Sequence, residues 1–214
     1  MISPTDLLEK QLKTEGFRFI VGVDEVGYGP LAGPVVAGAV VLPTGFDLEG
    51  IRDSKKLTQK QREEANKRIC DQAISFSTAF VFIDEIQTMG IRPATDEAMK
   101  EAVCNLSCGD IVLVDGNKKP SLPHLCRTII KGDVSIASIA AASIIAKVAR
   151  DYYMEELHAR YPVYGFAQHK GYGTTFHLQM IKKYGPCPEH RTEWKCFSEV
   201  SGVSYGVDLF EKIW

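Results

Sequence analysis

The sequence predicts an α/β protein in which helices flank a mixed central sheet. Three observations predict this class. Segments with the period of a strand alternate along the chain with segments that have the period of a helix. The first two strands are joined by a short loop rich in Gly and Pro, which makes them antiparallel neighbours. Residues 111–116 (IVLVDG) form a short apolar run, typical of a central strand covered on both faces.

The predicted elements follow one another in a simple order. Strands are expected at residues 17–24 (FRFIVGVD), 35–42, 74–83 and 111–116. Helices are expected at residues 5–15, 58–73, 94–107, 134–160 and 174–184. Thr58 is a candidate N-cap for the second helix, and Pro162 stops the long fourth helix. The first half of that long helix is rich in Ala and Ser, so we expect it to approach the sheet closely.

The division of the chain follows from these elements. We expect a core domain over residues 1–162 and a small, largely helical C-terminal module over residues 163–214 that packs on it. The last residues, VDLFEKIW, would place Leu209, Phe210, Ile213 and Trp214 on one helix face. That face either packs on its own domain or docks in the groove of a partner protein.

Composition limits the class of protein. The 214 residues are 45 % hydrophobic and 24 % charged, which is ordinary for a globular chain, and the net charge of −2 requires any phosphate-binding surface to be local. The six cysteines include no CxxC pair, which argues against a zinc site and favours reduced thiols. The N-terminus does not resemble a signal peptide, and the longest apolar run is too short to span a bilayer. We therefore expect a monomeric cytoplasmic protein without membrane contact.

Two adjacent acids stand at the end of the first apolar run. Asp24 and Glu25 are followed directly by a loop that contains Gly27, Gly29 and Gly33. Neighbouring side chains of a strand point to opposite faces, so these two acids converge only if the strand ends between them and the chain turns. Glycine permits the backbone angles of such a turn. The local sequence is thus compatible with two carboxylates at one end of a sheet.

Two further acids lie at element boundaries. Asp115 ends the central strand, where sites of α/β sheets usually lie, although alone it could be a turn residue. Asp133 precedes the long helix, and taken alone it could be a plain N-cap. Four neighbouring carboxylates repel one another unless cations lie among them, and an oxygen-only ligand set favours Mg²⁺ or Mn²⁺. Two such ions about 3.5–4 Å apart suit hydrolysis of a phosphodiester.

Several motifs resemble one known family. The chain contains VDEVGYGPLAGPVVAGAVVL, DSKKLT, VDG, KGDVSIASIAAASIIAKVARD, YGFAQHKGYGT and GPCPEHR, in this order. In these motifs residues 17–197 resemble ribonuclease HII, the type 2 ribonuclease H family. The resemblance implies a ribonuclease H-like fold and an endonuclease that cuts the RNA strand of RNA–DNA hybrids, including ribonucleotides embedded in duplex DNA. It implies 3′-hydroxyl and 5′-phosphate products and a role in ribonucleotide excision during DNA replication and repair.

The resemblance also assigns roles to residues. The family's metal-binding catalytic acids fall on Asp24, Glu25, Asp115 and Asp133, which would hold two Mg²⁺ or Mn²⁺ ions. The family's Gly-Arg-Gly segment, which approaches the 2′-hydroxyl that distinguishes RNA, is Gly27-Tyr28-Gly29 here. Further substrate contacts are expected from the two lysines of DSKKL, from the tyrosine that stacks near the following deoxyribose, and from the basic residue of GPCPEHR: Lys55, Lys56, Tyr172 and Arg191.

Two departures from the family pattern keep an alternative open. Tyr28 replaces the family arginine, and Gly90 stands where an asparagine is often found. Both changes concern substrate contacts and leave the acids intact. The chain could therefore be a hybrid-binding homologue with weak catalysis, or a nuclease with a shifted substrate preference.

Overall fold

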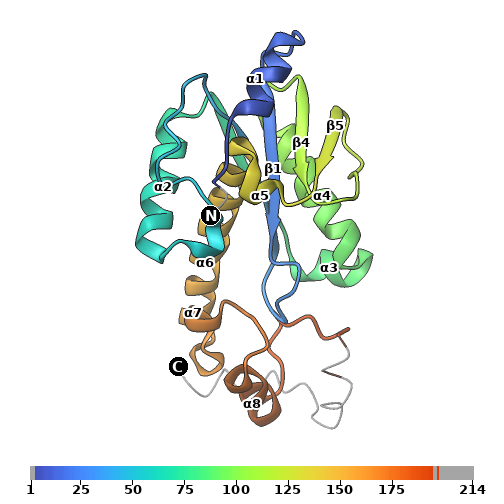
Figure 1. The fold of residues 1–214 in the computed structure, drawn as a ribbon. Helices are drawn as coiled ribbons and strands as arrows, with labels where there is room; N and C mark the ends of the chain where they lie inside the picture. The colour runs from blue at the N-terminus through green and yellow to red at the C-terminus, as the bar shows by residue number, and fades with distance from the viewer. Residues whose placement is uncertain (1–2, 195–196, 198–214) are drawn as a thin grey trace.

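The computed structural model describes residues 3–194 and 197, and it contains one five-stranded sheet (Figure 1). The strand order is β3-β2-β1-β4-β5. The first three strands in the chain pair antiparallel, whereas β1 with β4 and β4 with β5 pair parallel, as predicted for a mixed sheet. The strands are β1 (Ile20–Val26), β2 (Val35–Val41), β3 (Ser75–Val81), β4 (Ile111–Asp115) and β5 (Leu125–Ile129).

Helices surround this sheet and continue into the C-terminal part of the chain. The α-helices are α1 (Leu7–Thr14), α2 (Gln59–Gln72), α3 (Ile83–Met89), α4 (Ile91–Cys104), α5 (Gly132–Ser135), α6 (Ala137–Arg160), α7 (Phe166–His169) and α8 (Thr175–Tyr184), and the short 3₁₀ turns are η1 (Ser54–Lys56) and η2 (Pro162–Tyr164). Thr58 caps α2 as predicted, because its side chain accepts from the backbone N–H of Gln61. No helix in the described part of the chain is long and apolar enough to cross a membrane.

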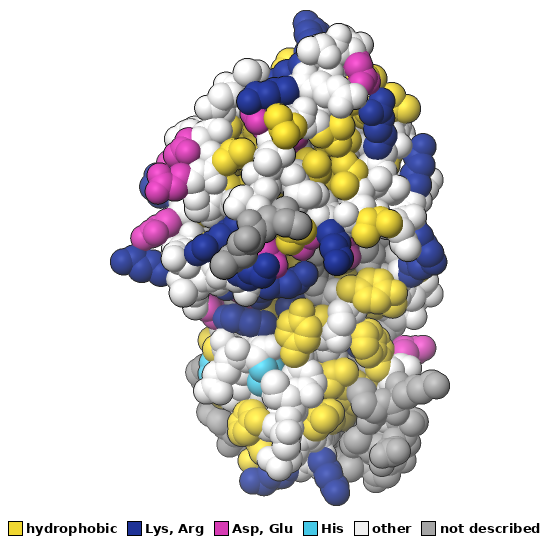
Figure 2. Space-filling view, viewed as in Figure 1, with side chains coloured by type: hydrophobic (Ala, Val, Ile, Leu, Met, Phe, Trp, Pro, Cys, Tyr) yellow, Lys and Arg dark blue, Asp and Glu magenta, His cyan; other side chains and the backbone are white. Residues whose placement is uncertain are grey.

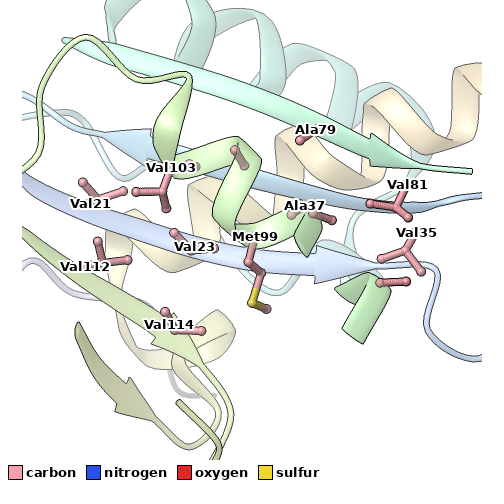
Figure 3. Close-up of a cluster of buried hydrophobic side chains, with 14 of the residues drawn as sticks. Val21, Val23, Val35, Ala37, Ala79, Val81, Met99, Val103, Val112 and Val114 are labelled. Carbon is pink, nitrogen blue, oxygen red and sulfur yellow. The ribbon is translucent and has the colours of Figure 1, made fainter. Parts of the chain in front are cut away.

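Alternate residues of the strands build two cores. Val21 and Val23 of β1, with Val112 and Val114 of β4, pack on the face covered by α4 (Figure 3). The intervening residues pack on the opposite face, where Leu113 meets Ile139 of α6. This alternation follows from the period of two along a strand, and it buries the central strands on both faces.

Helix α6 lies unusually close to the sheet, as its Ala- and Ser-rich first half predicts. A Cβ atom added to Gly22 would come within 2.1 Å of the carbonyl carbon of Ser138, and one added to Gly38 within 2.4 Å of the carbonyl oxygen of Ala142. The two glycines therefore leave the space that the helix backbone occupies. Gly38 is the strand partner of Asp24, so this close approach occurs beside one of the predicted metal ligands.

The residues after α6 fold back onto its C-terminal half. Tyr164, Phe166 and Ile181 form a buried cluster with Met154 of α6 and Leu31 of the loop that follows β1. A single bridge between Ala32 and His190 also ties this loop to the C-terminal residues. The described part of this region thus contacts α6 and the loop after β1, whereas residues 198–214, which include the predicted tail helix, lie outside the described residues.

The structure differs from the expected elements at five places. Strand β1 continues to Val26, and the single predicted helix at 134–160 is two helices separated by an extended Ile136. Helix α4 begins at Ile91 because its proline, Pro93, lies in the first turn, where a missing N–H costs nothing. Neither α3 nor β5 was expected: α3 is short and ends at Gly90, and β5 is an edge strand with alternating exposed residues.

Candidate active site

The sheet brings Asp24 and Asp115 side by side. In the parallel pair of β1 and β4, Val23 is opposite Val114, so the next residue of each strand is an aspartate. Asp24 is two residues after Gly22 and therefore points to the α6 face of the sheet, where it is 6 % exposed. The expected strand end between the two acids is wrong, because Glu25 also lies inside β1, which continues to Val26.

Asp133 reaches the same end of the sheet from α5. The interpretation of Asp133 as the N-cap of the long helix is wrong, since it lies in the first turn of α5 and the N-cap of α6 is Ile136. The turn before Asp133 is fixed by a hydrogen bond of 2.6 Å from the backbone N–H of Gly132 to Oδ1 of Asp115. A short bond between adjacent elements thus couples the positions of two of the acids.

Burial and mutual repulsion shift the pKa values of these carboxyls. Burial, then the charge of Glu25, raises the pKa of Asp24 well above its usual range, although a hydrogen bond from Ser143 opposes the shift. Burial, then the charge of Asp115, raises the pKa values of Glu25 and Asp133. Each of these carboxyls is therefore ionised more easily when a cation is present among them.

One lysine already lies beside the acids. The Nζ atom of Lys55 is 3.7 Å from Oδ2 of Asp133, and its side chain is 79 % exposed. Lys56 instead pairs with Asp53, also at 3.7 Å. Of the two predicted lysines, Lys55 is therefore the one that the structure brings to the carboxylates.

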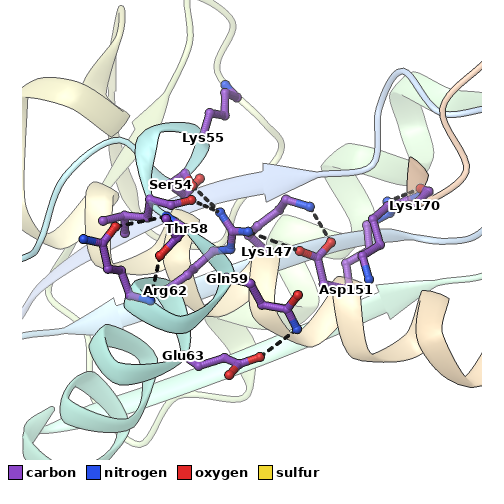
Figure 4. Close-up of polar contacts among 12 residues, drawn as sticks. Ser54, Lys55, Thr58, Gln59, Arg62, Glu63, Lys147, Asp151 and Lys170 are labelled. Atoms are coloured by element: carbon purple, nitrogen blue, oxygen red, sulfur yellow. Dashed lines mark hydrogen bonds and ion pairs between the residues drawn. The ribbon is translucent and has the colours of Figure 1, made fainter. Parts of the chain in front are cut away.

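A polar network anchors the turn that carries Lys55. Ser54 contacts Ser143 of α6 through their hydroxyl oxygens at 3.0 Å. Arg62 donates to the carbonyl oxygen of Ser54 (Figure 4). Arg62 also pairs with Asp151 of α6 at 3.7 Å. Because Ser143 also hydrogen-bonds Asp24, the same helix residue links the basic turn to a buried acid.

The donor chemistry of the acids fits a hard divalent cation. All four side chains offer only carboxylate oxygens, and burial, followed by the charges of neighbouring acids, raises the pKa values of Asp24, Glu25 and Asp133. Among residues 3–194 and 197, no group of three or more Asp, Glu, His or Cys side chains is arranged so that it could hold a metal ion. The carboxylates thus lie near one another at one end of the sheet, but they do not enclose a position for a metal ion.

The predicted recognition residues lie together. Tyr28 and Tyr172 are each 46 % exposed, and a Cβ atom at Gly29 would lie 3.9 Å from Cε1 of Tyr172. The loop after β1 and the tyrosine of the C-terminal region therefore share one surface. Figure 2 shows Lys and Arg side chains gathered across the middle of one face around a few acidic atoms, with hydrophobic side chains beside them.

Arg191 has a different position from the other predicted substrate residues. It is 1 % exposed, and its guanidinium donates to the backbone carbonyls of Gly27, Tyr28 and Gly33. Sequence reasoning missed its neighbour Arg150, which is fully buried in α6 and also donates to backbone carbonyls. The available signal was an arginine within an apolar helical run, where an unpaired charge is costly.

A buried pair of histidines is hydrogen-bonded to the backbone of Tyr172. His177 Nδ1 lies 2.9 Å from the carbonyl oxygen of Tyr172, which can only accept, so this nitrogen donates. His177 Nε2 then accepts from His190 Nε2 at 3.0 Å, and His190 Nδ1 accepts from the N–H of Cys187 at 2.9 Å. Both rings are neutral, and burial lowers the pKa of His177 to about 4 and that of His190 to about 3. No sequence spacing indicated this pair.

Comparison with known proteins agrees with the predicted fold and family. The ribonuclease HII of Caldicellulosiruptor bescii is 52% identical over 185 residues, which cover 86% of this chain and 90% of that protein. The ribonuclease HII of Chlamydia caviae is 49% identical over 201 residues, which cover 92% of each. The crystal structure of ribonuclease H2 from Pyrococcus horikoshii OT3 matches with a TM-score of 0.73 and 27% identity, covering 86% of this chain and 97% of that one.

The match extends over the segments that carry the site. A family model described as Ribonuclease HII matches residues 21–197, a range that contains every predicted site residue. The ribonuclease H-like fold is confirmed, and no finding favours a homologue that only binds hybrids. The chain is a hydrolytic nuclease that acts on the RNA of RNA–DNA hybrids, and it belongs to the ribonuclease HII family.

Proposed function

We propose that Asp24, Glu25, Asp115 and Asp133 hold two divalent cations, Mg²⁺ or Mn²⁺, for hydrolysis of a phosphodiester next to a ribonucleotide. The observation that carries the proposal is the grouping of these acids at one end of the sheet, where burial and the charges of neighbouring acids raise the pKa values of Asp24, Glu25 and Asp133. When bound, two such ions would activate a water and stabilise the charge on the leaving 3′-oxygen, so that the products would carry 3′-hydroxyl and 5′-phosphate ends.

The chain's own residues orient the acids and the substrate. Ser143 donates a hydrogen bond to the carboxylate of Asp24 and so fixes it against α6. The N–H of Gly132 fixes one oxygen of Asp115 and leaves the other oxygen for a ligand. Lys55 places an exposed ammonium near Asp133, where it can contact a substrate phosphate beside the cleaved bond.

The recognition surface supports action on single ribonucleotides in duplex DNA. Gly27-Tyr28-Gly29 offers backbone groups to the 2′-hydroxyl, and Tyr172 beside Gly29 offers an aromatic face to the next sugar. Tyr28 offers one neutral hydroxyl where an arginine would offer a charged fork, so the backbone has the larger share of recognition here. In this proposal residues 163–214 contribute to substrate binding through Tyr172.

A protein partner is proposed only on the sequence of the tail. A related structure, 25% identical with a TM-score of 0.69, is a PCNA:RNase HII complex from Archaeoglobus fulgidus. The apolar face of residues 209–214 is a segment of this chain that could dock in such a partner. It lies outside the described residues, and packing on its own domain stays the alternative.

Cleavage of two substrates tests the proposal. One is duplex DNA with a single embedded ribonucleotide, and the other is a continuous RNA–DNA hybrid, each with Mg²⁺, Mn²⁺ or EDTA. We expect incision on the 5′ side of the single ribonucleotide with either metal and none in EDTA. Cleavage of the continuous hybrid alone would contradict the proposed recognition, and cleavage in EDTA would contradict the role of the metal.

A further inference from the structure

Two buried arginines lie beneath the loop that follows β1. Arg150 of α6 is 0 % exposed and Arg191 is 1 % exposed, and within the described ranges neither guanidinium pairs with a carboxylate. Their partners are backbone carbonyls instead. The loop concerned comprises residues 27–34, which we call the β1–β2 loop.

Arg150 holds the far end of the β1–β2 loop. Its Nε donates to the carbonyl of Pro34 at 2.9 Å, and its Nη2 donates to the carbonyl of Ala32 at 3.0 Å. The third nitrogen, Nη1, donates to the carbonyl of Lys170 at 2.9 Å. One side chain from α6 therefore joins the loop to the C-terminal region that carries Tyr172.

Arg191 holds the near end of the same loop. Its Nη2 donates to the carbonyls of Gly27 and Gly33, each at 2.7 Å, and its Nη1 donates to the carbonyl of Tyr28 at 3.1 Å. Arg191 belongs to the C-terminal region, whereas the loop lies between the first two strands. Together the two arginines draw five of the loop's eight carbonyls inward.

This arrangement is costly, which indicates a purpose beyond stability. Burial lowers the pKa of Arg150 to about 10, and burial together with the charge of Arg150 lowers the pKa of Arg191 to about 9. Buried charges are often replaced by apolar side chains without loss of stability. The guanidiniums orient the peptide groups of the loop through hydrogen bonds, which apolar side chains could not do.

The direction of the carbonyls fixes the direction of the amides. The described chain has no cis peptide bond, and in a trans peptide the C=O and the N–H point in opposite directions. Because the carbonyls of Gly27 and Tyr28 point inward to Arg191, the N–H groups of Tyr28 and Gly29 point outward. Within residues 3–194 and 197, neither of these N–H groups donates to a protein acceptor. They are therefore free to bind a ligand.

The glycines of the loop are required by this arrangement. Gly27 has a φ of +99°, and a Cβ atom there would lie 2.6 Å from Nε of Arg150. Gly33 has a φ of +83°, and its Cβ would lie 2.4 Å from Sδ of Met154. A side chain at Gly27 would therefore collide with the guanidinium of Arg150, and one at Gly33 would collide with Met154.

We propose that Arg150 and Arg191 are positioning residues that turn the carbonyls of the β1–β2 loop inward and thereby aim the N–H groups of Tyr28 and Gly29 at the ribonucleotide. The inference deepens the proposed function and rests on it. It also gives the C-terminal region a second role, since Arg191 sets the conformation of a loop that belongs to the core. The two buried guanidinium charges polarise the peptide groups of the loop and so strengthen the N–H groups of Tyr28 and Gly29 as donors. This effect does not depend on the side chain of Tyr28, which is neutral.

The test compares Arg191→Lys and Arg150→Lys with wild type. A lysine can reach one or two of the carbonyls but cannot reproduce the planar fork. For duplex DNA with one ribonucleotide we expect KM to rise about tenfold, as for the loss of about one hydrogen bond, and kcat to change much less. The preference for this substrate over a continuous hybrid should fall. Mn²⁺ binding, followed by calorimetry, should stay unchanged, because the acids do not contact either arginine.

Arg68→Lys is the matched control. Arg68 also donates to a backbone carbonyl, that of Glu49, and stacks on Phe46, but it lies away from the loop. This variant should keep the wild-type substrate preference. If the arginine variants lose activity equally on both substrates, in parallel with their melting temperature, the role is only structural and the proposal is overturned.

A measurement on the wild-type protein covers the case of variants that do not fold. Amide NMR shifts are recorded on adding the single-ribonucleotide duplex in EDTA, which prevents cleavage. The proposal expects large shifts at the N–H groups of Tyr28 and Gly29, and unmoved amides there would overturn it. Failure of the wild type to incise this duplex would instead overturn the proposed function, so the two failures are distinguishable.

Discussion

Replacing Gly22 with alanine tests the packing that places Asp24 against α6. The added Cβ atom would lie 2.1 Å from the carbonyl carbon of Ser138 and 2.4 Å from the backbone nitrogen of Ile139. These atoms belong to helix backbone, which no rotamer change can move aside. Helix α6 must therefore retreat from the sheet by about 1 Å to restore an ordinary contact.

The magnitude follows from this displacement. Overpacking a core costs about 1–3 kcal/mol, and a clash with backbone lies at the upper end of that range. We expect Gly22→Ala to lower the free energy of unfolding by about 3 kcal/mol and Tm by about 6–12 °C. Since α6 also carries Ser143, which hydrogen-bonds Asp24, the folded fraction should lose nuclease activity as well.

Urea denaturation followed by circular dichroism measures the loss, and Gly29→Ala is the control. A Cβ atom at Gly29 would meet nothing closer than 3.9 Å, so this variant should stay within about 0.5 kcal/mol of wild type. Equal stability of the two variants would refute the argument that close helix packing at Gly22 positions the site.

Two further predictions concern the recognition surface. Because burial lowers the pKa values of His177 and His190, the unfolded chain binds protons below pH 6.5 that the folded chain excludes until about pH 4 and 3. The free energy of unfolding should therefore fall as pH decreases through this range, by up to about 1.4 kcal/mol per pH unit for each histidine. In urea titrations at several pH values, His177→Gln should make this dependence on pH less steep. An unchanged dependence would count against the two histidines as buried neutral groups. Tyr28→Arg should tighten binding of the single-ribonucleotide duplex about tenfold, measured by fluorescence anisotropy in EDTA, because a charged donor replaces a neutral one. Unchanged or weaker binding would show that Tyr28 makes a compensating contact of its own.

The sequence predicts those parts of the fold and site that depend on local patterns. The run IVLVD predicts a central strand because its four consecutive apolar residues suit burial on both faces, and it locates Asp115 at the strand end. Thr58 predicts the start of α2 because an N-cap residue is a local signal, and the structure adds a capping box with Gln61. The metal-ligand roles of the acids came from the family resemblance, and they stay proposals.

Other parts depend on contacts that no local pattern encodes. Arg150 meets the carbonyl of Ala32 across 118 positions of the chain, and Arg191 meets Gly27 across 164. Only the folded chain shows that these arginines share one loop. The strand end expected between Asp24 and Glu25 failed for a related reason, because pairing with β2 extends β1 to Val26.

Metal binding by Asp115→Asn tests the central claim most directly. This change removes one negative oxygen from the proposed ligand set, while the remaining amide oxygen can still accept from the N–H of Gly132. Asp84→Asn, at an exposed position in α3, is the matched control. Mn²⁺ binding is measured by calorimetry, and cleavage of a continuous RNA–DNA hybrid is measured on the same samples.

The proposed four-carboxylate site predicts that folded Asp115→Asn binds Mn²⁺ much more weakly and cleaves at least about a hundredfold more slowly, whereas Asp84→Asn matches wild type in both. A folded Asp115→Asn protein with near-normal metal binding and cleavage would contradict the assignment of these acids as the metal ligands.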